Sequence, residues 1–361
     1  MPEQPLSQLA LYPARPTVRL NGAEHDRITR LLSAMDLREE EHGLSALELR
    51  FTNIASNAEG GADFAFEDEG TFKLGDRLAV YAGDESAPTE IFAGLVTGIE
   101  AEFTDSGAPM LTALAEDRLQ QARMKRRTRT YDNQSLADIA RSIASDHGLT
   151  PQISGFSDPL GVEVQLNESD LAFLRRLLGR HDGDLQVVGD ELQISPRGDV
   201  RRGAVDLALN SQLRRVTVLA DLAQQVTEVT LTGWNPGQGQ RVTGRSSGSH
   251  QGPGQGRTGA EVLRDAIGAR SHQLSHLAAT TDGEANALAD AAYDERQRRF
   301  VTANGTAEGN PAIRVGTHVT LAGLGPRFSN TYYVTRCRHR FDLNLGYETD
   351  FTAECAFFGR P

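Results

Sequence analysis

The chain has 361 residues, of which 39% are hydrophobic, and its formal net charge is −12. This length suits roughly two or three domains, and the acidic balance argues against a nucleic acid as a specific ligand. The sequence has no apolar run of about 18 residues, which argues against a membrane span. Residues 1–6 lack the basic and apolar regions of a signal peptide, so we expect synthesis in the cytoplasm.

Residues 1–125 are predicted to form a β domain. Alternation of apolar and polar residues predicts strands over 17–20, 47–51, 72–81, 91–103 and 110–117. A tight turn is expected at Asn21-Gly22, residues 28–32 continue outward from it, and residues 55–70 are interpreted as a loop. Gly94 and Gly98 predict bends or bulges within the longest strand, as a sheet that curls into a barrel requires. We therefore predict a small barrel of about five or six strands.

Residues 123–129 read Arg-Met-Lys-Arg-Arg-Thr-Arg and form the densest basic run of the chain. We interpret this run as a solvated linker between two modules. The alternative is a contact with phosphate or with an acidic neighbouring subunit, because opposite charges steer and orient association.

Residues 126–196 are predicted to form a small α/β module with two helices. Ser135 can cap the first helix with Asp138 three residues later, as in a capping box, and Gly148 suits the C-terminal cap. Asn167 or Ser169 can cap the second helix, which we expect to end at Gly179 and Gly183. Its predicted buried stripe consists of Leu171, Leu174, Leu177 and Leu178, with Phe173 beside them. Residues 185–188 and 191–194 then predict a hairpin around Gly189-Asp190.

The order of these features resembles the middle of phage late control protein D and of the hub half of VgrG proteins. The similar segments read SLADIARSIASDHGL and LNESDLAFLRRLLGRHDGDLQVVGDELQI. The resemblance implies a trimeric hub of a contractile tail or injection system, which joins a sixfold inner tube to a threefold spike. It also implies β-barrels similar to the tube protein. VgrG proteins continue beyond such a hub, whereas this chain stops at Pro361, so we expect a separate spike protein.

Residues 197–361 are predicted to form a second β domain. Strands are expected over 214–219, 226–234, 313–321, 332–341 and 347–357, with the last two joined in a hairpin about Gly346. A helix is expected over 284–299. Residues 235–259 are rich in Gly, Gln, Ser, Arg and Pro, so we interpret them as a loop that cannot order itself. Their Gly254-x-Gly256-x-x-Gly259 pattern lacks a leading strand and is not taken as a dinucleotide site.

Two stretches of the second β domain repeat the pattern of the first. Residues 72–80 match 313–321, and residues 95–103 match 333–341. In both cases a glycine turn and another alternating strand follow. This weak internal repeat predicts two related barrels with the α/β module between them.

The sequence contains no pattern to which we assign catalytic, cofactor or metal chemistry. His272 and His276 lie four residues apart in a candidate helix over 266–277, but no Glu or Cys nearby completes a metal site. Cys337 and Cys355 are symmetric about Gly346, so a cross-strand disulfide is one reading of their spacing. Cytoplasmic synthesis favours two reduced thiols instead.

We therefore predict an α+β, mainly β, fold with tube-like barrels in residues 1–125 and 197–361 and the α/β module in residues 126–196. The predicted function is a non-enzymatic baseplate hub, a homotrimer that contacts the inner tube, the spike and baseplate wedge components within a tail particle. A cell-envelope glycan-binding protein is the main alternative. A hydrolase that uses loop carboxylates is the less favoured one.

Overall fold

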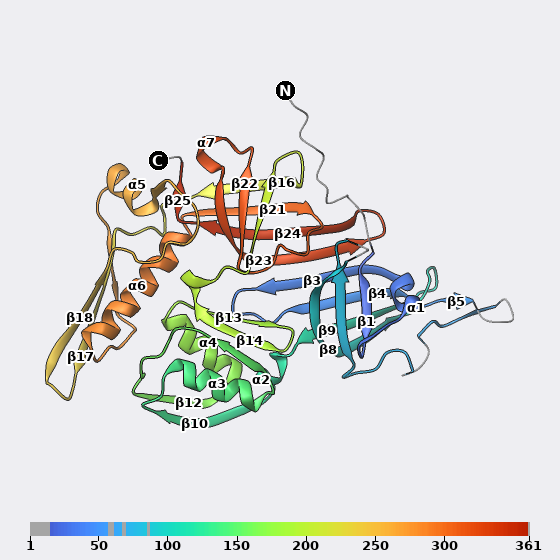
Figure 1. The fold of residues 1–361 in the computed structure, drawn as a ribbon, viewed down its shortest axis with the longest axis horizontal. Helices are drawn as coiled ribbons and strands as arrows, with labels where there is room; N and C mark the ends of the chain where they lie inside the picture. Colours follow the sequence, from blue (N-terminus) through green and yellow to red (C-terminus); the bar gives the residue numbers. More distant parts are fainter. Residues whose placement is uncertain (1–14, 57–60, 67–69, 85–86, 360–361) are drawn as a thin grey trace.

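The computed structural model describes residues 15–56, 61–66, 70–84 and 87–359. The centre of the fold is a thirteen-stranded, largely antiparallel sheet, which contains strands from both the N-terminal and the C-terminal parts of the chain (Figure 1). The early strands are β1 (Thr17–Leu20), β2 (Ala23–Glu24), β3 (Leu32–Glu40), β4 (Ala46–Thr52), β7 (Arg77–Ala82), β8 (Thr89–Glu102) and β9 (Met110–Asp117). The late strands are β15 (Gly203–Ala208), β16 (Leu213–Ala220), β21 (Val301–Glu308), β22 (Thr317–Ala322), β23 (Asn330–Asp342) and β24 (Gly346–Cys355).

The early strands mostly match the sequence prediction. Asn21 and Gly22 both adopt positive φ angles and make the expected tight turn between β1 and β2. Residues 28–32 do not continue as an extended segment, because most of them belong to α1 (Asp26–Leu31), which buries Ile28. β3 was not predicted from the sequence, and β7 begins only at Arg77. The predicted loop over 55–70 contains β5 (Ala55–Ser56) and β6 (Ala62–Asp63), and part of it lies outside the described residues.

Five strands in each half of the sheet follow the same order. We call β3, β4, β7, β8 and β9 the first unit and β16, β21, β22, β23 and β24 the second unit. The order is β3-β4-β9-β8-β7 in the first unit and β16-β21-β24-β23-β22 in the second. Each strand of one unit therefore has a counterpart, in the same chain order, in the other. Within the described residues the pairings leave each unit open, so closed barrels stay a prediction.

The two units also share two register irregularities, whereas a third, between Val80 and Tyr81 of β7, occurs in the first unit and has no counterpart between β22 and β23. One bulge interrupts β3 after Leu32 and β16 after Leu213, and a second interrupts β8 after Val96 and β23 after Val334. The bulge in β8 lies next to Gly98, where the sequence predicted one. Matching the bulges aligns residues 95–103 with 333–341, which agrees with the repeat found in the sequence.

The α/β module packs below the sheet in the view of Figure 1. It contains α2 (Gln120–Met124), β10 (Arg126–Asp132), α3 (Leu136–Asp146), β11 (Thr150–Ile153), β12 (Val162–Ser169), α4 (Asp170–Arg180), β13 (Gly183–Val188) and β14 (Glu191–Pro196), and the 3-10 turn Arg197–Asp199 follows. Ser135 caps α3 and Ser169 caps α4, as expected. Gly148 has the predicted positive φ angle. Gly179 does not end α4, which continues to Arg180.

An insertion between β16 and β21 forms a layer of its own. It contains β17 (Glu228–Asn235), β18 (Gln240–Ser246), β19 (Arg257–Thr258), α5 (Gly259–Ala266), β20 (Ser271–Leu274) and α6 (Asp282–Arg298). The strands pair in the order β18-β17-β20, and α6 lies against β17 and β18. The short α7 (Gly325–Phe328) precedes β23, and β25 (Phe357–Phe358) pairs with β19.

Two sequence expectations are wrong in this insertion. Residues 235–259 are not an unordered loop, because β18 pairs with β17 along its whole length and the backbone after it is held by Asp294. Its glycines serve close packing: a Cβ at Gly244 would lie 2.2 Å from the Ala285 backbone of α6. Residues 266–277 do not form a helix either, since β20 pairs in parallel with β17.

The two cysteines do not face each other. The β23–β24 hairpin places Cys337 opposite Phe351, whereas Cys355 pairs with Val301 on β21. Both thiols are buried and free. The symmetry about Gly346 does not bring the two cysteines opposite each other, because Asp342 pairs with Gly346 and the centre of the hairpin therefore lies two residues earlier.

Candidate functional site

Two buried groups of charged residues join the parts of the fold. The first lies where β3 of the first unit pairs with β23 of the second. There the buried carboxylate of Glu39 accepts hydrogen bonds from Arg314, with the Arg314 Nε 2.7 Å from Glu39 Oε2. Burial opposes the charge on Arg314, but the Glu39 carboxylate raises the guanidinium pKa above its usual range. This ion pair ties residues that are 275 positions apart in the sequence.

His339 and Cys337 complete this group, which we call the junction cluster. The Cys337 thiol lies 3.3 Å from His339 Nε2 and donates to the Ile313 carbonyl at 2.9 Å, and the Tyr347 hydroxyl lies 2.7 Å from His339 Nδ1. Burial raises the pKa of Cys337 well above its ordinary value and lowers that of His339 to about 4. Both side chains are therefore neutral at pH 7.

Glu39, Cys337 and His339 are the residues whose spacing would suit a metal ion within the described part of the chain. The surrounding chemistry favours a hydrogen-bonded cluster instead. Arg314 already uses both Glu39 oxygens, and its positive charge would repel a cation. The neutral thiol would have to lose its proton before it could bind a metal. The junction cluster therefore serves to hold the two units together.

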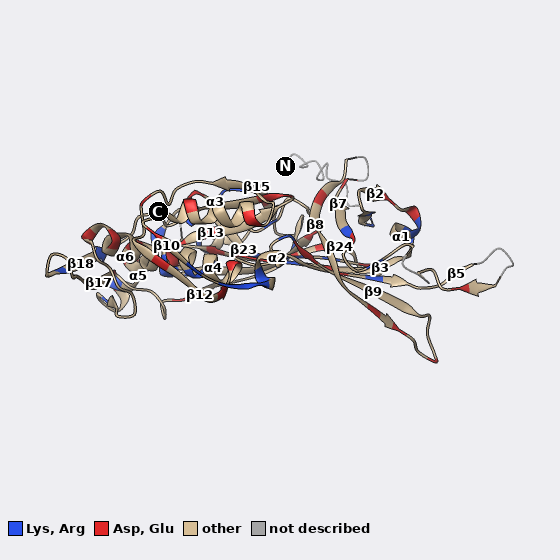
Figure 2. Ribbon diagram, turned by 90° about the horizontal axis from the view of Figure 1, so that it is seen from below, with Lys and Arg blue, Asp and Glu red and all other residues tan. Residues whose placement is uncertain are grey.

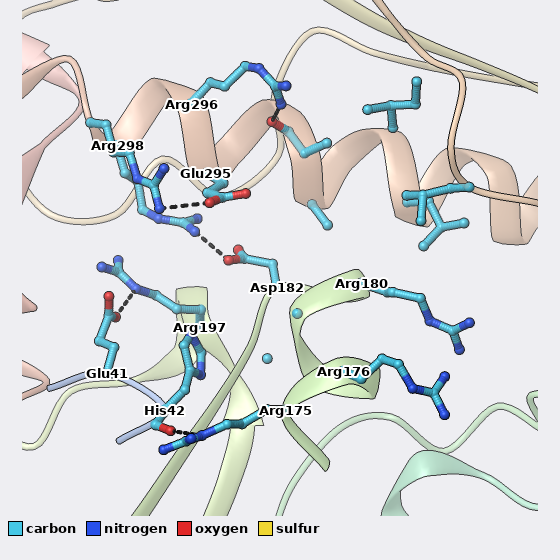
Figure 3. A pocket seen from close by; sticks show the side chains of 18 of the residues that line it. Glu41, His42, Arg175, Arg176, Arg180, Asp182, Arg197, Glu295, Arg296 and Arg298 are labelled. Atoms are coloured by element: carbon cyan, nitrogen blue, oxygen red, sulfur yellow. Dashed lines mark hydrogen bonds and ion pairs between the residues drawn. The ribbon is translucent and has the colours of Figure 1, made fainter. Parts of the chain in front are cut away.

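The second group surrounds a cavity of about 560 Å³ between α4, α6 and the sheet (Figure 3). Seven arginines and four acidic residues line it, so it is locally basic in an acidic chain. Arg197 lies between Glu41 and Glu354, and Arg298 pairs with Asp182. Burial opposes the charge of Arg197, but the two glutamates raise its pKa above the usual range.

These pairs connect four parts of the chain. Glu41 follows β3, Arg197 follows the α/β module, Arg298 ends α6 and Glu354 lies on β24. Arg197 also stacks over the Tyr333 ring, with its guanidinium carbon 3.4 Å from the ring centre. The arginines at the centre of the cavity therefore form ion pairs with acidic residues of the same chain, and we assign the cavity a structural role.

The basic run over residues 123–129 is not a linker. It ends α2 and forms the start of β10, which pairs with β12. Arg127 and Arg129 both donate to Asp146, and Arg123 donates to Glu116. Three of the four arginines in the run therefore pair with acidic side chains of the same chain. In Figure 2, basic and acidic residues are interspersed along the molecule.

His272 and His276 do not share a helical face, because His272 lies on β20 and faces Arg296, with 3.0 Å between the nitrogen atoms. None of the helices in the described residues has the length and apolar character needed to cross a membrane. Neither the junction cluster nor the arginine-lined cavity was predicted from the sequence. Their members are far apart in the sequence, and no local spacing brings them together.

Several solved structures share this fold. The 43 kDa tail protein of prophage MuSo2 from Shewanella oneidensis has a TM-score of 0.69 and 13% identity, and the match covers 94% of this chain and 97% of that one. A tail protein from Neisseria meningitidis has a TM-score of 0.64 and 10% identity, with 94% and 96% covered. The c3393 protein of E. coli, a type VI secretion component similar to the T4 tail proteins gp27 and gp5, has a TM-score of 0.61 and 12% identity, with 95% and 79% covered.

The family model described as the Alg8 N-terminal domain matches residues 19–342. No curated protein sequence matches the chain. At these low identities the structural similarities show the fold, and they show it over nearly the whole chain.

Proposed function

Since this chain, which belongs to the Alg8 N-terminal domain family, has the fold of phage tail proteins, we propose from that fold that it is a structural hub of a phage tail or a phage-tail-like contractile injection system. In this role the protein is a homotrimer without enzymatic activity. It adapts a sixfold inner tube to a threefold spike and contacts baseplate wedge components. The protein is incorporated in the assembled phage-tail or injection-system particle.

The observation that carries this proposal is the register-matched repeat. Each chain holds two units with the same strand order and with bulges at equivalent places. Three chains therefore supply six similar units, so a threefold ring can present a nearly sixfold face. A protein that joins a sixfold tube to a threefold spike needs such a face.

The two buried charged groups support a role that transmits force. Glu39–Arg314 locks the first unit to the second, and the arginine-lined cavity locks both to the module and the insertion. Buried ion pairs that lose one partner are strongly destabilising, so such contacts resist separation of the parts. A rigid chain suits a hub that moves with the tube when a sheath contracts.

The native mass of the purified full chain tests the proposal. Light scattering should give about 118 kDa, three times the chain mass of 39.2 kDa, and electron microscopy should show rings with six similar lobes. A monomer at high concentration would contradict the homotrimer. A monomer that also binds peptidoglycan saturably would favour the cell-envelope alternative.

A further inference from the structure

The contact between the two units uses one strand edge from each. The distal half of β23, Arg336 to Asp342, pairs antiparallel with β3 from Ala34 to Glu40. The proximal end of β23 pairs with β22, so β23 changes partner along its length. The second unit therefore reaches across to the first through the projecting half of its β23–β24 hairpin.

The repeat has a second copy of both edges. The counterpart of β3 is β16, and the counterpart of β23 is β8. β16 pairs with β21 on one side, and β8 pairs with β7 only as far as Leu95. Among the described residues, the other edge of β16 and the edge of β8 beyond Thr97 have no strand partner. Figure 1 shows β16 at one end of the sheet, and Figure 2 shows the β8–β9 hairpin extending away from the body.

The bulges fix how these edges correspond. Ser33 in β3 corresponds to Arg214 in β16, and Thr97 in β8 corresponds to Thr335 in β23. Each internal pair between β3 and β23 then has a counterpart between β16 and β8. The pairs Cys337–Glu39, His339–Leu37 and Phe341–Met35 become Ile99–Ala220, Ala101–Val218 and Phe103–Val216.

The solvent exposure of the side chains differs between the two equivalent strand edges, as expected if the β23 edge is paired and the β8 edge is unpaired. Cys337, His339 and Phe341 are buried in the internal contact. Their counterparts are exposed: 38% for Ile99 and 66% for Phe103, with Ala101 also open to solvent. All three counterparts are apolar. Ile99 and Ala101 point to one face of β8, because side chains alternate along a strand, and Phe103 directly follows Glu102, the last residue of β8. A row of apolar side chains on an unpaired strand edge marks a surface that pairs with another strand.

The open edge of β16 is complementary to that of β8. Val216, Val218 and Ala220 are half-buried and form its apolar row. On the opposite face the matched register places Arg215 diagonally across from Glu102, and diagonal neighbours on a sheet are within reach of long side chains. The two edges thus match in apolar content and in charge.

We propose that the edge of β16 pairs antiparallel with residues 98–104 of a second copy of this chain, in the register that β3 and β23 use within one chain. The contact is head-to-tail, so every chain offers one edge of each kind. Such contacts close into a ring when the rotation between chains allows it. The number of chains in the ring rests on the proposed function, whereas the pairing of the edges does not.

Disulfide trapping tests the register. A chain with Ala101→Cys and Val218→Cys should form disulfides between chains under mild oxidation, because directly opposed residues on neighbouring strands have Cβ atoms about 4.5–5.5 Å apart. The matched control carries Ala101→Cys and Leu219→Cys. Leu219 is more exposed than Val218, but its side chain points to the other face of β16. The native thiols are buried and do not compete.

The products separate the two proposals. A covalent trimer on a non-reducing gel, at least ten-fold more abundant than in the control, supports both. Cross-linked chains of another number support the edge pairing and contradict the threefold hub. A native trimer without cross-links, or with equal cross-links in the control, overturns the edge pairing and leaves the hub standing.

A second variant does not depend on oxidation. Phe103→Asp places a charge in the proposed contact and should weaken self-association at least ten-fold, as measured by sedimentation. Phe103 is exposed in the single chain, where its ring packs edge-to-face against the exposed ring of Phe64, so the change should leave the circular dichroism spectrum nearly unaltered. Ile267→Asp alters an exposed apolar residue near α5 and should have no effect on association. Equal association of both variants would also overturn the pairing.

Discussion

Replacing Arg314 by leucine should destabilise the protein by leaving the Glu39 carboxylate buried without its partner. Glu39 is 1% exposed and Arg314 is 25% exposed. Removal of one member of a buried ion pair costs about 3–5 kcal/mol. Because Arg314 is partly exposed, water can enter the vacated space, so we expect about 3 kcal/mol. Urea unfolding followed by circular dichroism measures this loss as a change in the free energy of unfolding.

A neighbouring ion pair provides the control. Arg336 and Glu40 pair across the same two strands, but they are 61% and 58% exposed. Exposed pairs contribute about 0.2–1 kcal/mol, so Arg336→Leu should cost no more than that. Adding Glu39→Leu to Arg314→Leu should restore much of the lost stability, since it removes the unpaired charge. Equal losses for both single variants, or a further loss in the double variant, would refute the reasoning.

Three further predictions concern buried groups. Leu174→Asp puts a charge into the core of the module and should lower the free energy of unfolding by roughly 3 kcal/mol or more, whereas Ala172→Asp on the exposed side of the same helix should leave thermal melting nearly unchanged. Burial raises the pKa of Cys355 to about 12 and that of Cys337 well above its ordinary value, so a thiol reagent at pH 8 should label neither until guanidinium unfolds the chain, and labelling of the native protein would contradict this. Burial lowers the pKa of His339 from 6.5 to about 4, so between these pH values the unfolded chain binds more protons than the folded chain, and the stabilising contribution of the neutral histidine is lost as the pH falls from 6.5 to 4. The difference in the free energy of unfolding between the wild type and His339→Gln should therefore shrink over this range by up to about 3 kcal/mol. A constant difference would refute the assignment.

Local patterns predicted the elements that depend on neighbouring residues. The serine caps at Ser135 and Ser169, the turn at Asn21-Gly22 and the hairpin about Gly189-Asp190 all formed where expected. Each rests on hydrogen bonds or backbone angles within a few residues. The repeat was also visible, because strands with equivalent neighbours keep equivalent alternation of apolar and polar residues.

Long-range packing overruled local composition elsewhere. Residues 240–246 are mostly polar and lie within the glycine-rich stretch 235–259, yet they form a strand because β17 and α6 cover them and the Gly244 position has no room for a side chain. Residues 271–274 pair with β17 instead of forming a helix. β3 was not predicted from the sequence, even though it joins the two units.

The sequence by itself determined the class of fold, the caps and turns of the module and the presence of a repeat, because these follow from periodicity and local hydrogen bonding. Tertiary structure alone decided which edges of the repeated units meet. It brought Glu39 to Arg314 across 275 positions, buried one copy of the strand edge and left the other open. The physical reason is that an ion pair or a strand pairing between distant segments depends on how the whole sheet folds, so the residues next to each partner in the sequence do not predict it.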